Sequence, residues 1–109
     1  MTVREWVTSR STQVPDVLTA RVIELLGADA DQPASGSGAA CLAAAQRSLE
    51  QLLASGRYER DSALDLLAVD ALTTFAFEHA AEASASAADI KRLAMDGARA
   101  LSGIAAENG

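Results

Sequence analysis

Residues 66–82, LLAVDALTTFAFEHAAE, constrain the fold most, because their apolar side chains fall on two nearly opposite sides of the helix that they predict. The first apolar face holds Leu64, Leu67, Ala68, Ala71, Leu72 and Phe75. The second face holds Leu66, Thr73 and Phe77. A helix that is apolar on both sides has to be covered on both sides. Either it lies at the centre of the fold, or a second copy of the chain covers the second face.

The composition indicates an all-α protein. The chain has 109 residues, 50% of them hydrophobic and only 4% aromatic, and alanine is the commonest type. Alanine has the highest intrinsic helix propensity, whereas strands favour aromatic and β-branched residues. A chain of this length fits one domain with a packed core. We therefore expect a single helical domain over residues 1–109.

Signals for helix starts and ends divide the chain. Thr2 and Glu5 form a capping box, Pro15 suits a first helical position, and Gly27 and Gly56 favour helix ends. The predicted helices span residues 3–9, 15–26, 39–55, 61–83 and 87–106, with a surface loop over residues 28–38. Short connections make consecutive helices antiparallel neighbours. The expected architecture is a compact antiparallel bundle of four main helices plus a short N-terminal helix.

Two further apolar faces follow from helical spacing. In the helix over residues 39–55 the predicted inner face consists of Leu42, Ala45, Leu49, Leu52 and Leu53. In the last helix it consists of Ile90, Leu93, Ala94, Gly97, Leu101 and Ile104. A glycine in mid-helix costs about 1 kcal/mol relative to alanine. We expect another helix to cross at Gly97, because a residue without a side chain allows a neighbouring helix to approach closely and so compensates this cost.

The charge of the chain disfavours several classes of partner. The formal net charge is −6 and the isoelectric point is near 4.6. An acidic surface repels nucleic-acid phosphates and anionic lipids, so neither nucleic acid nor a membrane is expected as a partner. Cys41 is the only cysteine, and MTVREWVTSR lacks the apolar core of a signal peptide. A cytoplasmic location is expected.

Four polar residues interrupt residues 66–82. Asp70 lies at the edge of the second face, where it either pairs with Arg47, Arg57, Arg92 or Arg99 or acts as a general base with a raised pKa. Metal ligands can use the spacings of Glu78, His79 and Glu82. His79 is, however, the only histidine in the chain. The alternative for these three is a hydrated end of the helix. No metal or other cofactor is expected.

The remaining candidates for chemistry give weak signals. Cys41 lies near a predicted helix start, which can lower a thiol pKa, but a small buried cysteine among alanines fits the same pattern. The tripeptide over residues 36–38, Gly-Ser-Gly, precedes a helix but lacks the lysine of a phosphate-binding loop. The sequence therefore favours a function without catalysis.

The function expected from these patterns is a helical interaction or dimerisation module. Its interface is predicted to contain Leu66, Phe77, Asp70 and Trp6, and its partner is a second copy of the chain or another helical protein. The alternative is a bundle that binds a small molecule or a metal in a pocket near Phe75, Glu78, His79 and Glu82.

Overall fold

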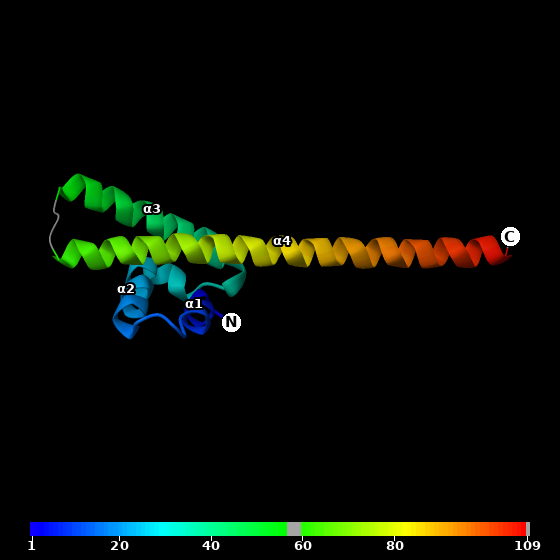
Figure 1. The fold of residues 1–109 in the computed structure, drawn as a ribbon, viewed down its shortest axis with the longest axis horizontal. Coiled ribbons are helices and arrows are strands. Elements are labelled where there is room, and N and C mark those ends of the chain that lie inside the picture. Colours follow the sequence, from blue (N-terminus) through cyan, green and yellow to red (C-terminus); the bar gives the residue numbers. More distant parts are fainter. Residues whose placement is uncertain (57–59, 109) are drawn as a thin grey trace. The chain divides into compact units, whose positions relative to one another are not determined.

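The computed structural model describes residues 1–56 and 60–108, with side chains described except at positions 60, 61, 100, 101 and 103–108. These residues form α-helices and short 3-10 helices and include no strand, so the predicted all-α class is confirmed (Figure 1). The elements are α1 (Val3–Arg10), α2 (Asp16–Leu26), η1 (Gly27–Asp31), η2 (Ala34–Gly36), α3 (Ser37–Ser55) and α4 (Arg60–Asn108).

The chain separates into two units, Met1–His79 and Ala80–Gly109. The first unit holds the hydrophobic core, and the second consists of the last part of α4. The predicted helix break at residues 84–86 is wrong, because α4 continues through these residues. Ser84 and Ser86 stand among alanines with no glycine or proline beside them. Serine costs a helix only a few tenths of a kcal/mol, roughly, so two isolated serines do not end one.

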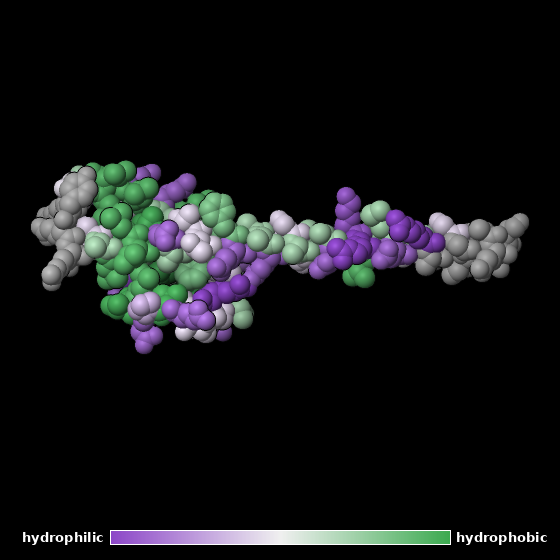
Figure 2. Space-filling view, in the orientation of Figure 1, coloured by the Kyte–Doolittle hydropathy of each residue, from purple (hydrophilic) through white to green (hydrophobic). Residues whose placement is uncertain are grey.

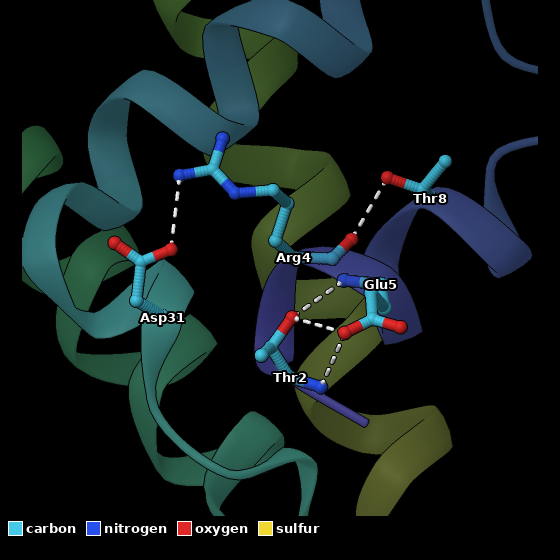
Figure 3. A network of polar contacts seen from close by, with 5 residues as sticks. All are labelled: Thr2, Arg4, Glu5, Thr8 and Asp31. Carbon is cyan, nitrogen blue, oxygen red and sulfur yellow. Dashed lines mark hydrogen bonds and ion pairs between the residues drawn. The ribbon is translucent and has the colours of Figure 1, made fainter.

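Helix α1 begins with the predicted capping box. Thr2 Oγ1 accepts a hydrogen bond from the Glu5 backbone N–H at 3.2 Å, and Glu5 Oε1 accepts one from the Thr2 backbone N–H at 3.2 Å (Figure 3). Arg4 on the same helix reaches Asp31 of η1, with Nη2 and Oδ1 3.3 Å apart. These contacts orient the buried side of α1, which consists of Val3, Trp6 and Val7.

The connection between α2 and α3 is more ordered than the surface loop expected for residues 28–38. It contains η1 and η2, and Ala30 within η1 is fully buried. Backbone hydrogen bonds join it to the N-terminus, from Val3 N–H to Gln32 O at 2.9 Å and from Ala34 N–H to Met1 O at 2.9 Å. The segment is therefore part of the fold, since its backbone groups find partners on a distant segment.

The core of the first unit is built from η1 and from every α-helix in the unit. The buried apolar residues are Val3, Trp6, Val7, Val22, Leu26, Ala30, Cys41, Ala44, Ala45, Ala68, Leu72 and Phe75. Helix α3 contributes only small side chains to this core. Small side chains let the α3 backbone approach its neighbours closely, while larger ones on α1, α2 and α4 fill the space between.

The predicted inner face of α3 is therefore wrong in large part. Leu42, Leu49 and Leu53 are 46%, 40% and 69% exposed, whereas Cys41, Ala44, Ala45 and Ser48 are buried. Only Ala45 of the predicted face lies fully inside. The alanine-rich side faces inward because it allows the closer approach, and this leaves the large leucines outside.

Helix α4 has one covered side in the first unit. Ala68, Leu72 and Phe75 are buried there, as the sequence pattern predicts. Leu67, which was placed on the same face, is 57% exposed, so its placement is wrong. Leu67 lies 100° around the helix from Ala68, and the neighbouring elements do not extend over that arc.

In the second unit, every described side chain is exposed. Ile90 is 65% exposed and Leu93 is 72% exposed, while Leu101 and Ile104 lie outside the residues whose side chains are described. A Cβ atom added at Gly97 would meet nothing within 4 Å, so the close approach of another helix expected at this glycine is not found among the described residues of the second unit. Among the described residues, no helix combines the length and apolar character needed to cross a membrane.

Candidate interaction surface

The side of α4 opposite the core carries two large apolar residues. Leu66 is 50% exposed and Phe77 is 72% exposed, and their separation of eleven residues corresponds to about three helical turns. Asp70 lies between them on the same side and is also exposed. Leu72 points the other way and is fully buried. We call Leu66, Asp70 and Phe77 the outer face of α4.

The polar groups beside the outer face are largely satisfied within the helix. The hydroxyl of Thr73 donates to Val69 O at 2.9 Å, and that of Thr74 donates to Asp70 O at 3.0 Å. Because both hydroxyls already donate to backbone carbonyls, a partner could cover the methyl groups of the two threonines without leaving a hydroxyl donor unpaired. The carboxylate of Asp70 is the only charged group on the outer face.

Within the described residues of the first unit, no arginine pairs with Asp70. Arg47 donates to Leu25 O at 3.3 Å, Arg92 pairs with Asp89 at 3.8 Å, and Arg57 lies outside the described residues. Because Asp70 is exposed, water solvates its carboxylate, and the fold of a single chain does not require a partner for it.

Helix α3 adds further apolar surface to the first unit. Leu42, Leu49 and Leu53 recur at helical spacing, and all three are exposed. Figure 2 shows hydrophobic residues gathered over the part of the first unit where α3 and the first turns of α4 lie. Single exposed apolar residues are ordinary on protein surfaces, whereas a cluster of them is typical of an interaction site.

Trp6, the fourth residue predicted for the interface, lies in the core and is only 7% exposed. Its ring makes edge-on contacts with Phe75, at 6.0 Å between centroids, and with His79, at 5.2 Å. The guanidinium carbon of Arg10 lies 5.3 Å from the centroid of the same ring. The placement of Trp6 in the interface is therefore corrected, since its apolar surface is already covered by its own chain.

The residues considered as metal ligands have other contacts. His79 Nε2 lies 3.1 Å from Ala34 O, a contact that requires the proton on Nε2. Glu78 Oε2 lies 3.9 Å from Arg10 Nη1, and Glu82 belongs to the second unit. Among the described residues, no group of three histidine, cysteine, aspartate or glutamate side chains could hold a metal ion. His79 thus serves the packing of α4 against α1 and η2.

One residue named for the predicted pocket, Phe75, belongs to the core of the first unit. Phe75 is 5% exposed and lies against Trp6. A surface depression occurs elsewhere, between α2 and α4, and is lined by Val17, Ala20, Arg21, Glu24, Leu64 and Asp65.

Charged side chains in that depression pair with one another. Arg21 Nε lies 2.6 Å from Asp65 Oδ1, and Arg21 Nη1 lies 2.8 Å from Glu24 Oε2. The hydrogen bond to Asp65, and then that to Glu24, raises the pKa of Arg21 above its ordinary value. Sequence reasoning missed this pair because its members are 44 residues apart and no local pattern connects them.

The remaining chemical candidates are buried or isolated. Cys41 is fully buried, and burial raises the pKa of its thiol to about 11, opposite to the shift that an activated nucleophile needs. Ser37 is also fully buried, and its hydroxyl oxygen has no hydrogen-bond partner among the described residues. The N-cap residue of α3 is Gly36, so no side chain at this position caps the first turn of the helix.

Comparison of the chain with models of protein families, with curated proteins and with solved structures finds no match. The function is therefore inferred from the exposed side chains themselves. Among these, the outer face of α4 is a candidate for an interaction site, because Leu66 and Phe77 lie close in helical projection and are both large.

Proposed function

We propose that this protein is a non-enzymatic helical interaction module that self-associates through the outer face of α4. The observation that carries the proposal is the exposure of Leu66 and Phe77, at 50% and 72%, on a side of the helix that its own chain leaves uncovered. Removing such side chains from water stabilises a complex by roughly 25 cal/mol for each Å² of apolar surface buried.

A second copy of the chain is the partner that fits this face best. A helix face can meet its own copy across a two-fold axis, so one apolar patch supplies both halves of the contact. The leucines of α3, Leu42, Leu49 and Leu53, provide further apolar area on the same unit. A different helical protein with a matching apolar face is the second possible partner.

Asp70 makes the proposed contact specific rather than strong. A carboxylate that is moved out of water without a partner opposes association. Asp70 therefore has to remain hydrated at the rim or to meet a cation of the partner. Either arrangement restricts the ways in which two outer faces can pack.

The proposal is tested with the double substitution Leu66→Gln and Phe77→Gln. Sedimentation equilibrium at micromolar concentration should give the wild-type chain a mass above 11.2 kDa, and the variant a lower mass at the same concentration. Both residues are exposed, so the circular dichroism of the variant should match that of the wild type.

Val17→Gln provides the matched control, because Val17 is 65% exposed but lies on α2. This substitution should leave the mass of the assembly unchanged. A wild-type mass of 11.2 kDa at every concentration would refute self-association. Loss of helical structure in the double variant would instead assign Leu66 and Phe77 to the core.

The alternative of a bundle that binds a small molecule or metal near Phe75, Glu78, His79 and Glu82 stays a prediction. Phe75 packs against Trp6 in the core, so a ligand there would lie nearer to the polar residues that follow it on the helix. Thermal unfolding with divalent metals or apolar ligands would test it, with His79→Ala as the variant that should abolish any stabilisation. We also propose, for the interaction module, a cytoplasmic location and no nucleic-acid or membrane partner.

A further inference from the structure

The second unit, Ala80–Gly109, carries an apolar surface that the proposed function does not use. Ile90 and Leu93 are 65% and 72% exposed, and no described side chain in this unit is buried. A helix gains most of its stability in water from packing of an apolar face rather than from propensity alone. A segment that is helical and carries two large uncovered apolar residues therefore has the surface of one member of a helix pair.

A seven-residue repeat places the two large apolar residues Ile90 and Leu93 of this segment at inner positions. Ala83, Ile90 and Gly97 are spaced by seven, which is the spacing of position a in a coiled coil. Ser86 and Leu93 each follow an a residue by three and occupy position d. Among parallel coiled coils, Ile at a combined with Leu at d favours two helices over larger assemblies. The pattern thus points to two strands and to a partner with the same repeat.

The acidic residues select the orientation of the pair. Glu82, Asp89 and Asp96 are also spaced by seven and precede each a residue, so they occupy position g. In an antiparallel pair of identical helices, the g rows would face each other and repel. In a parallel pair each g row faces the e row of the other helix, which contains Ala87 and Ala94. Like charges are therefore kept apart only in the parallel arrangement.

We propose that residues 82–99 pair, parallel and in register, with the same residues of a second copy of the chain. Ile90 then packs against Ile90 of the other copy, and Leu93 against its counterpart. Ala83, Ser86 and Gly97 supply little apolar area, so the pairing is weak and depends on protein concentration. It involves none of the outer-face residues and stands independently of that association.

Cysteine cross-linking tests the register directly. In the proposed pair, Ser86 of one copy faces Ser86 of the other, whereas Ser84 occupies position b and points away from the seam. Both serines are exposed. Under mild oxidation, Ser86→Cys should form a covalent dimer about tenfold faster than Ser84→Cys, since a disulfide requires two close Cα atoms. The native Cys41 can remain, because it is fully buried.

Leu93→Lys provides the second arm of the experiment. Added to Ser86→Cys, it should slow the cross-link to the rate of Ser84→Cys, while Met95→Lys, at an exposed apolar residue off the seam, should not. Equal rates for the two single cysteine variants, or a cross-link that is insensitive to Leu93→Lys, would overturn the proposal. The measurement is repeated with Leu66→Gln and Phe77→Gln present, so that failure of the outer face and failure of this pairing are distinguished.

Discussion

The imidazole ring of His79 lies edge-on to the indole ring of Trp6, with centroids 5.2 Å apart and planes at 83°. Its Nε2 atom also meets Ala34 O at 3.1 Å. His79 therefore joins α4 to α1 and to η2, and its Nε2 atom is occupied by the contact with Ala34 O. Gly38 lies against the same ring, since a Cβ atom there would be 2.9 Å from His79 Nδ1.

Gly38→Ala should lower the stability of the protein through this contact. The added methyl group forces His79 away from Ala34 or α3 away from α4, at a typical overpacking cost of about 1–3 kcal/mol. The gain in helix propensity is about 1 kcal/mol, so the net loss should be roughly 1 kcal/mol. Urea denaturation followed by circular dichroism measures the change in the free energy of unfolding.

The matched control for Gly38→Ala uses the His79→Ala background. There the new methyl group meets no ring, and only the gain in helix propensity remains. The same substitution should then stabilise the protein relative to His79→Ala alone. A loss of stability in both backgrounds would mean that something other than His79 requires glycine at position 38.

Cys41 should be unreactive in the folded protein at neutral pH. Its thiol is fully buried, and burial raises its pKa to about 11. Iodoacetamide at pH 8 should modify it only after unfolding in guanidinium chloride, as mass spectrometry can determine. Modification at equal rates with and without denaturant would show that the thiol is accessible in the folded protein.

The same pKa shift predicts the alkaline stability. The unfolded thiol ionises near pH 9, while the folded thiol keeps its proton to about pH 11. Its contribution to stability is therefore complete below pH 9 and is lost as the pH rises from about 9 to about 11. Cys41→Ala should remove this part of the pH dependence when urea midpoints are compared across that range.

Asp65→Asn should destabilise the first unit by about 1 kcal/mol, because it removes the charged partner of Arg21 across α2 and α4. The side chains are 34% and 23% exposed, so water and salt screen part of the attraction. The loss of stability should therefore be smaller in 1 M NaCl, where the Debye length falls to about 3 Å. Glu24→Gln is the control. Glu24 contacts the same arginine but is 65% exposed and lies on the same helix, so its loss should be smaller.

Gly97→Ala should increase the helical content of the second unit, because the new Cβ meets nothing within 4 Å. Its gain in helix propensity is about 1 kcal/mol. The neighbouring substitution Ala98→Gly should reverse the sign, and circular dichroism at increasing temperature compares the two. A fall in helical content on Gly97→Ala would mean that the backbone of another chain passes close to residue 97.

Local signals identified the structure well where they act within a few residues. The capping box of Thr2 and Glu5 forms at the start of α1, and α3 ends at Gly56, which has a left-handed φ of 60°. The predicted helix break at residues 84–86 failed for a local reason as well. Its pattern fits a helix start but does not oppose a helix interior, so the surrounding alanines decide the outcome.

The inner face of α3 and the ion pair of Arg21 and Asp65 could not be found in this way. Alanines occur on several sides of α3, so helical spacing gives more than one apolar face. Reasoning from hydrophobicity chose Leu42, Leu49 and Leu53, which proved to be exposed. The exposed position of Leu66 and Phe77 follows from periodicity, whereas the burial of Trp6 depends on contacts with Phe75 and His79.

By itself, the sequence determined that this protein is all-α, that it is acidic, and that α4 has two apolar sides, because composition, charge and helical period are properties of neighbouring residues. Only the tertiary structure decided which side of each helix is covered. That choice depends on how closely two backbones approach, as at Gly38 and His79, which are 41 residues apart. Leu72 and Phe75 of α4 lie in the core with residues of α1, α2 and α3. Leu66 and Phe77 of the same helix lie at the surface of the chain.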